Sequence, residues 1–226
     1  MRTFGAFAPV SRPLSVLDLG SGVGRFTPAL AEAFGGPVYG VEPSARMREA
    51  AEANAAHPAV TYLGGRAEAI PLPDQSCDLV LMYLSFHHVR DRAAAAREIV
   101  RVLRPGGRLL LRSVFSDRLH ITHAHGWHRF FTRAQEIERQ MFPSLQEATD
   151  VFAAVGLKPI AFETIERAFA PSLAASAEML RHRAISTFEH MTEEEIADGF
   201  RRLDAAVVAE TEPQPVLGKE DLLVLS

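Results

Sequence analysis

The feature that most constrains this chain is a glycine-rich turn after a short apolar strand, in the stretch Val16-Leu-Asp-Leu-Gly-Ser-Gly-Val-Gly-Arg-Phe26. Gly20, Gly22 and Gly24 stand at alternate positions, and a helical pattern over residues 26–34 follows at once. Glycine lets the backbone approach a ligand without a Cβ clash and adopt a positive φ. The helix start behind the turn presents unpaired N–H groups and a partial positive charge. The pattern predicts the ligand-binding turn of a Rossmann-type unit.

Two acids accompany this turn, and the glycine spacing narrows the kind of ligand. Asp18 precedes the glycines, and Glu42 ends the next apolar strand, where a Rossmann-type unit binds ribose hydroxyls. A dinucleotide fingerprint reads G-x-G-x-x-G, but here the third glycine comes one position early and Arg25 stands where that pattern has glycine. The pattern favours a nucleoside-bearing cofactor other than NAD, and a glycine-rich turn without a ligand is the alternative.

Strand and helix patterns alternate along the chain, which is typical of a doubly wound, mostly parallel α/β sheet with helices on both faces. We expect seven strands, at about residues 15–19, 38–41, 60–63, 78–83, 108–114, 157–165 and 221–225. We expect helices between the early strands at about residues 25–34, 45–56 and 91–103, and a capped helix from residue 144. The sequence therefore predicts a Rossmann-like domain.

Composition excludes several other classes of protein. A net charge of −4 provides no basic field for tracking nucleic acid, so we expect no nucleic-acid partner. The single cysteine, Cys77, rules out an internal disulfide. No apolar run reaches the roughly 18–20 residues that span a bilayer, and the first residues lack the apolar core of a signal peptide. We expect a cytoplasmic protein with no membrane partner.

Three further segments carry a family resemblance. They are Gly64-Gly-Arg-Ala-Glu68 with the following loop to Asp78, then Phe86-His-His-Val, and then Glu98-Ile-Val-Arg-Val-Leu-Arg-Pro-Gly-Gly107. Together with D-x-G-x-G-x-G, in this order and spacing, they resemble class I S-adenosylmethionine (SAM) methyltransferases, in particular the small-molecule type 11 family. The resemblance covers roughly residues 14–115 and implies SAM as cofactor, with S-adenosylhomocysteine (SAH) as product.

The resemblance also implies a role for individual residues of the cofactor site. The methionine part of SAM would be surrounded by Asp18, Gly20, Ser21 and Gly22, with Gly24 completing the loop. Glu42 would hold the ribose hydroxyls. The adenine would lie against Pro43 and Met47 and accept a hydrogen bond from the backbone N–H of Ala67. The residues bordering the sulfonium would be Leu84 and Ser85.

Position 66 departs from the family pattern. Relatives usually have an aspartate there, which accepts a hydrogen bond from the adenine amino group, whereas this chain has Arg66. Arginine cannot accept a hydrogen bond. Either Glu68 or a backbone carbonyl replaces the aspartate, or the adenine is bound less tightly; a surface position for Arg66 is an equal alternative.

The C-terminal half contains two insertions, at residues 116–143 and 170–215, within what we expect to be one methyltransferase domain over residues 1–226. Apolar residues spaced three and four apart predict helices at about 172–191 and 192–210, the second opened by the capping box Thr192-Glu-Glu-Glu195. Helices at this position would suit a cap over the substrate. A packing or homodimer role is an equal alternative.

Histidines supply the remaining candidates for chemistry. His87 and His88 directly follow the fourth predicted strand, close to where the methyl group should lie, so we consider both as catalytic candidates. In the first insertion, His120, His123, His125 and His128 fall within nine residues. A packing role, a substrate pocket and a metal site are all open for this stretch, and we predict no bound metal. In the pocket interpretation His123 would act as a base, and the substrate would contact His88, His123, Trp127 and Phe130.

These patterns lead to one preferred function and two alternatives. We expect a SAM-dependent methyltransferase acting on a small-molecule acceptor, with O-methylation slightly favoured and a natural product of secondary metabolism as the expected type of substrate. One alternative is a SAM-binding protein that uses the cofactor structurally or for another reaction. The other, an NAD-type oxidoreductase, is disfavoured by Gly24 and Arg25.

Overall fold

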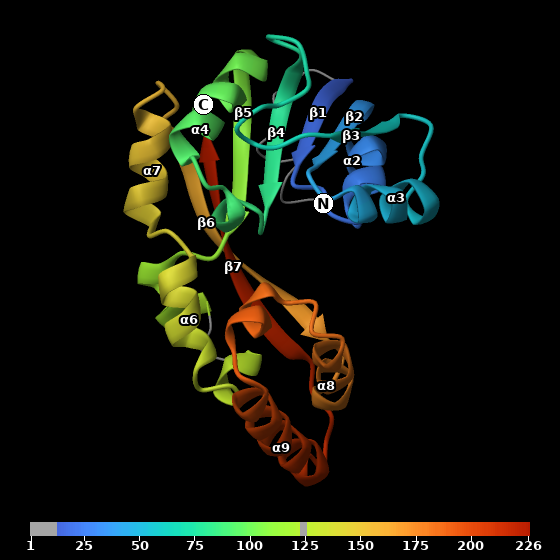
Figure 1. The fold of residues 1–226 in the computed structure, drawn as a ribbon, viewed down its shortest axis with the longest axis vertical. Coiled ribbons are helices and arrows are strands. Elements are labelled where there is room, and N and C mark those ends of the chain that lie inside the picture. The colour runs from blue at the N-terminus through green and yellow to red at the C-terminus, as the bar shows by residue number, and fades with distance from the viewer. Residues whose placement is uncertain (1–12, 123–125) are drawn as a thin grey trace. The chain divides into compact units, whose positions relative to one another are not determined.

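A computed structural model describes residues 13–122 and 126–226. Within them the chain forms a seven-stranded sheet in the order β3-β2-β1-β4-β5-β7-β6, which confirms the predicted Rossmann-like architecture (Figure 1). The strands are β1 (Leu14–Leu19), β2 (Gly35–Glu42), β3 (Val60–Gly64), β4 (Cys77–Tyr83), β5 (Leu103–Ser113), β6 (Pro159–Ala170) and β7 (Val216–Leu225). The helices are α2 (Thr27–Phe34), α3 (Ala45–Asn54), α4 (Arg92–Val102), α5 (Leu119–Thr122), α6 (Ala134–Met141), α7 (Leu145–Ala153), α8 (Leu173–Arg181) and α9 (Glu193–Ala209).

The chain divides into two compact units. The first holds the described residues up to 113 together with residues 146–163 and 222–226; the second holds residues 114–145 and 164–221. Both predicted insertions fall within the second unit. No helix in the described part of the chain combines the length and apolar character that crossing a membrane requires.

The core of the first unit is the parallel part of the sheet. β3, β2, β1, β4 and β5 pair in parallel, and all six residues of β1 are buried. α2 packs on β1 and β2, α3 on β2 and β3, and α4 on β5. Strands buried on both faces require continuous apolar sequence, which is what Val16-Leu and Leu79-Val-Leu-Met supply. Because every one of these strands points the same way, their carboxyl ends meet at one edge of the sheet.

The second unit has its own aromatic core. Trp127, Phe131 and Phe188 are in mutual ring contact, with centroid distances of 5.3 Å, and Phe131 also meets Phe200 edge-on. Gly199 of α9 makes room for this packing, because a Cβ there would overlap the Phe131 ring. The amphipathic pattern of α8 and α9 is therefore used to build this core.

One predicted helix is shorter than expected. The pattern over residues 172–191 suggested a single helix, but α8 ends at Arg181 and a short 3₁₀ turn covers Ser186–His190. Arg183 adopts a positive φ of 49°, a left-handed conformation that cannot continue a right-handed helix. Its guanidinium binds both carboxylate oxygens of Glu193, at the start of α9. The prediction was wrong here because apolar spacing alone does not reveal such an interruption. The second predicted helix is confirmed, with both hydrogen bonds of its capping box present.

Candidate functional site

The glycine-rich loop joins β1 to α2 at the carboxyl edge of the sheet. Gly20, Gly22 and Gly24 have φ values of 82°, 57° and 75°, a left-handed region that favours glycine. A Cβ on Gly20 would lie 2.5 Å from the Cβ of Ser85, whereas a Cβ on Gly22 would meet nothing within 4 Å. Gly20 is therefore required for packing, and Gly22 leaves open space beside the loop. The loop is held to β2 by the N–H groups of Gly20 and Ser21, which both donate to the carbonyl of Val41.

Two buried carboxylates flank this loop. Asp18 of β1 is only 4% exposed. Its Oδ2 accepts a hydrogen bond of 2.7 Å from the hydroxyl of Thr27 at the start of α2. The pKa of Asp18 is raised to about 6. Burial is the largest cause, the Thr27 hydrogen bond partly offsets it, and the charge of Glu42 adds to it. Glu42 is 8% exposed and accepts from the backbone N–H groups of Gly22 and Ser44. The carboxylate of Glu42 is thus oriented toward the glycine loop by the loop itself.

Tyr62, which the sequence analysis did not identify, packs against the glycine loop. Tyr62 lies on β3, and a Cβ on Gly24 would overlap its hydroxyl. The same ring crosses Gly40 of β2, where a Cβ would come within 2.6 Å. The Tyr62 hydroxyl donates to the carbonyl of Ala55. The pKa of Tyr62 is raised, chiefly by burial, and a hydrogen bond with Thr27 offsets part of this effect. Gly24 and Gly40 therefore both make room for Tyr62.

Of the residues predicted to surround the adenine, Met47 is exposed and Glu68 is hydrogen-bonded to backbone groups. Met47 on α3 is 40% exposed, so its side chain is accessible to a ligand. Glu68 accepts from the backbone N–H groups of Arg90 and Asp91 and lies 3.7 Å from Arg66. Burial raises the pKa of Glu68, but backbone hydrogen bonds, those from Asp91 and Arg90 among them, leave it below its ordinary value. Arg66 and Glu68 thus bind each other, and Glu68 is largely committed to the loop at residues 90–91.

The turn after β4 is the third part of the site. Leu84 has a φ of 50°, which is uncommon for a residue with a branched side chain, and its N–H donates to the carbonyl of Arg112 on β5. The Ser85 hydroxyl donates 2.8 Å to the carbonyl of Leu19. Leu84 and Ser85 are therefore tied to both neighbouring strands beside the glycine loop, where the resemblance predicts them to border the sulfonium.

The predicted catalytic and substrate residues belong to two different units of the chain, His87 and His88 to the first, Trp127 and Phe130 to the second. His87 and His88 stack in the 3₁₀ turn Phe86–His88, with ring centroids 3.9 Å apart, and His88 is exposed. Trp127 and Phe130 are each 8% exposed and belong to the core of the second unit, which favours packing as their role. His123 and His125 lie outside the described residues, and among the described ones no group of three or more His, Cys, Asp or Glu is placed to hold a metal ion.

His128 takes part in a buried polar cluster of the second unit. Its Nε2 lies 3.1 and 3.2 Å from the two carboxylate oxygens of Glu138, and the Thr187 hydroxyl donates 2.7 Å to the same carboxylate. All three side chains are at most 6% exposed. This cluster joins three short elements, so it accounts for one of the four histidines by packing and hydrogen bonding.

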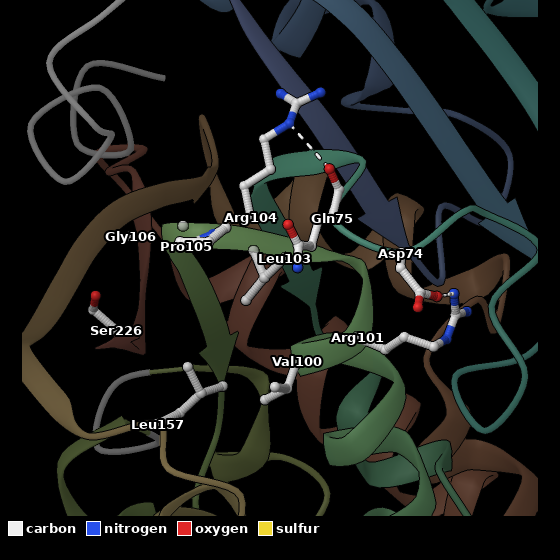
Figure 2. Close-up of a pocket in the computed structure, with 11 residues that line it drawn as sticks. Asp74, Gln75, Val100, Arg101, Leu103, Arg104, Pro105, Gly106, Leu157 and Ser226 are labelled. Atoms are coloured by element: carbon white, nitrogen blue, oxygen red, sulfur yellow. Dashed lines mark hydrogen bonds and ion pairs between the residues drawn. The ribbon is translucent and has the colours of Figure 1, made fainter.

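A cavity of about 360 Å³ lies at the opposite edge of the sheet, where β4 and β5 begin (Figure 2). Both arginines of its lining are already paired: Arg101 binds Asp74, and Arg104 binds the carbonyl of Gln75 and the carboxylate of Asp78. Because parallel sheets bind ligands at the carboxyl ends of their strands, this cavity does not coincide with the glycine loop. The candidate site is the carboxyl edge around the loop.

Comparison with known proteins agrees with this assignment. The parallel sheet, the glycine loop and the two buried acids define a class I, Rossmann-like methyltransferase fold. The methyltransferase domain model of the type 11 family matches residues 17–111. The chain is 31% identical over 151 residues to a methyltransferase of Anoxybacillus flavithermus of uncharacterized function, covering 62% of this chain and 68% of that relative. The chain belongs to this family of SAM-dependent methyltransferases, which confirms the resemblance predicted from its motifs.

Other relatives are similar over part of their length. An uncharacterized methyltransferase of Mycobacterium tuberculosis is 48% identical over 94 residues, which are 42% of this chain and only 37% of that relative. The 27-O-demethylrifamycin SV methyltransferase of Amycolatopsis mediterranei is 31% identical over 183 residues, covering 77% of this chain and 66% of the relative. The chain therefore spans little more than a third of the mycobacterial relative.

Solved structures support the fold. A candidate methyltransferase from an antibiotic biosynthesis pathway of Anabaena variabilis has a TM-score of 0.74 at 22% identity, covering 100% of this chain and 95% of the other. The [4+2]-cyclase SpnF has a TM-score of 0.63 at 16% identity, covering 99% and 81%. At these identities the likeness concerns the fold alone.

Proposed function

We propose that this protein transfers a methyl group from SAM to a small-molecule acceptor in the cytoplasm. The observation that carries the proposal is the pair of buried carboxylates, Asp18 and Glu42, on neighbouring strands at either side of a positive-φ glycine loop. A carboxylate at the end of β2 suits a ribose diol, and a second one suits a cationic ligand. The hydroxyl of Ser21 is buried and has no hydrogen-bond partner in the described residues, as expected for a group that binds a ligand.

When bound, SAM supplies an activated methyl group, whose carbon–sulfur bond breaks toward sulfur as the acceptor atom forms its bond to carbon. The residues of this chain bind and align the reactants, and such positioning can contribute about 7–11 kcal/mol to lowering a barrier. An O–H acceptor must also lose a proton, and the exposed imidazole of His88 is the first candidate to accept it. His87 is the second candidate for that role.

The type of acceptor is proposed from the relatives. The name of the Amycolatopsis relative states that it acts on a demethylated rifamycin, which supports a natural product and O-methylation for this chain as well. Because a [4+2]-cyclase shares the fold, the fold does not by itself require methyl transfer. SAM binding without transfer is therefore the second candidate function.

Calorimetry with SAH and NAD tests the cofactor. We expect SAH to bind and NAD not to bind. Glu42→Gln should weaken SAH binding by about 1–3 kcal/mol, because ribose hydroxyls lose a charged acceptor. Gly22→Val should weaken it further, since a β-branched residue cannot adopt a φ of 57° without strain. Glu49→Gln, an exposed position on α3, serves as the matched control and should bind SAH like the parent.

Incubation with methyl-labelled SAM and an extract of small molecules, followed by mass analysis, separates the two candidate functions. A labelled acceptor that needs intact Gly22 supports methyl transfer. Equal SAH binding by the parent and Gly22→Val would refute the cofactor site.

A further inference from the structure

An arginine of α3 binds the end of the strand that carries Glu42. The backbone N–H of Arg48 donates 3.0 Å to the carbonyl of Ser44, the N-cap of α3, so Arg48 lies in the first turn of this helix. Its Nη1 donates 2.7 Å to the carbonyl of Glu42 and 3.0 Å to the carbonyl of Pro43. The side chain therefore folds back from α3 onto the link between β2 and the helix.

The same guanidinium lies against β3. Gly64, the last residue of β3, stands opposite Glu42 in the parallel register. A Cβ on Gly64 would lie 3.1 Å from Cζ of Arg48, 3.2 Å from Nη2 and 3.4 Å from Nε, so a side chain at this position would crowd the guanidinium. Arg48 thus links the last residue of β2 to the last residue of β3.

The carboxylate of Glu42 is bound by the backbone at both oxygens. Oε1 accepts 2.9 Å from the N–H of Ser44, and Oε2 accepts 3.1 Å from the N–H of Gly22. Because each oxygen of an ionised carboxylate can accept two hydrogen bonds, both retain capacity for a ligand. Two acceptors side by side suit the two neighbouring hydroxyls of a ribose. Their direction depends on the backbone of residues 42–44, which carries both the carboxylate and one of its donors.

This backbone is restrained from two sides. Proline fixes its own φ and restricts the residue before it to extended conformations, so Pro43 limits the main chain of Glu42. Arg48 then holds the carbonyls of both residues with a charged donor, and such hydrogen bonds are roughly twice as strong as those between neutral groups. A carboxylate that must meet two hydroxyls at once tolerates a displacement of only about 0.5 Å, so support of this kind affects binding.

We propose that Arg48 is a positioning residue for ribose recognition. By holding the carbonyls of Glu42 and Pro43, it aligns the Glu42 carboxylate with the 2′- and 3′-hydroxyls of the cofactor. It thereby sets the preference of the site for a nucleoside with both hydroxyls over a 2′-deoxynucleoside. This inference rests on the proposed function, because it assumes that SAM or SAH lies on the glycine loop with its ribose at Glu42.

Calorimetric binding of SAH and of 2′-deoxy-SAH tests this role. The parent should bind SAH roughly tenfold or more tightly than 2′-deoxy-SAH, because the missing hydroxyl leaves a charged acceptor unpaired. Arg48→Met should reduce this ratio to about threefold or less, since the carboxylate is no longer aligned with the diol. Arg48→Lys, which can still donate to a carbonyl, should keep more of the ratio than Arg48→Met does. Arg46→Met changes an exposed arginine of the same helix and should keep all of it.

A second variant displaces the guanidinium without removing it. Gly64→Ala requires the guanidinium of Arg48 to move by a few tenths of an ångström. It should lower the ratio of the two affinities in the parent, and it should have no further effect on the ratio in Arg48→Met. A further loss of the same size in Arg48→Met would contradict the inference, because the added methyl would then act through another contact.

The ratio of the two affinities separates positioning from a merely structural role. If Arg48→Met lowers both affinities by the same factor and keeps the ratio, or if the parent binds SAH and 2′-deoxy-SAH equally, the inference is wrong and the proposed cofactor still stands. If the parent does not bind SAH, the inference and the proposed function fall together. Should Arg48→Met not fold, an unchanged ratio in Gly64→Ala overturns the inference.

Discussion

Replacing Gly40 by alanine tests whether Tyr62 supports the glycine loop. Gly40 has an ordinary strand φ, so alanine meets no backbone penalty there. Its Cβ, however, would lie 2.6 Å from Cδ1 and 2.8 Å from Cε1 of Tyr62, where ordinary contact begins at 3.4 Å. The ring cannot simply swing away, because its hydroxyl is bonded to the carbonyl of Ala55 and packs under Gly24.

The expected cost follows from these distances. To restore contact at 3.4 Å the ring and the added methyl must separate by most of an ångström, and overpacking of this kind typically costs about 1–3 kcal/mol. We expect Gly40→Ala to lower the free energy of unfolding by about 2 kcal/mol. Because the displaced hydroxyl touches the loop at Gly24, SAH affinity should fall as well.

A double-mutant cycle measured by urea unfolding isolates the contact. In a Tyr62→Leu background, Gly40→Ala should cost less than about 0.5 kcal/mol, so the coupling energy should be about 1.5 kcal/mol or more. Gly218→Ala, whose Cβ would lie 3.8 Å from the nearest atom, is the matched control and should be nearly neutral. Equal costs of Gly40→Ala in both backgrounds would refute the role of Tyr62.

Two further predictions concern buried acids. The raised pKa of Asp18 means that the folded protein binds a proton more tightly than the unfolded chain, so its contribution to stability is present at low pH and is lost as pH rises toward about 6. Urea unfolding should show a stability loss of about 2 kcal/mol between pH 4 and pH 7 that is absent in Asp18→Asn; parallel pH profiles would contradict this. Glu138→Gln should lower the free energy of unfolding by about 1–3 kcal/mol, because His128 and Thr187 lose a charged partner, while SAH affinity stays unchanged. A loss of SAH affinity in Glu138→Gln would show that the cluster serves the cofactor site.

The predicted fold and family are confirmed because their signals are local. Apolar runs specify the parallel strands, glycines specify a turn with positive φ, and side chains such as Ser44, Asp91 and Thr192 cap helices a few residues away. Each of these depends on neighbours in sequence, so spacing is sufficient to predict it. Where the local pattern was interrupted, at Arg183, the prediction was wrong.

Contacts between residues that are far apart in the chain could not be predicted from the sequence in this way. Tyr62 meets Gly24 across 38 positions of the chain, and Arg112 meets Tyr83 across 29, so neither pair has a spacing that signals it. Tyr83 did have one usable sign in the sequence, its place as the last residue of the fourth predicted strand. Likewise, the sequence left both a packing role and a substrate pocket open for Trp127 and Phe130, and their burial in the core of the second unit emerged only from the packing.

The sequence by itself determined the sheet, the glycine loop and the acids beside it, since these follow from residue type and short-range spacing. Only the tertiary structure decided which glycines make room for a side chain and which leave open space, and that Arg112 is buried against Tyr83. The reason is that steric overlap and burial depend on what strand pairing brings together from distant parts of the chain.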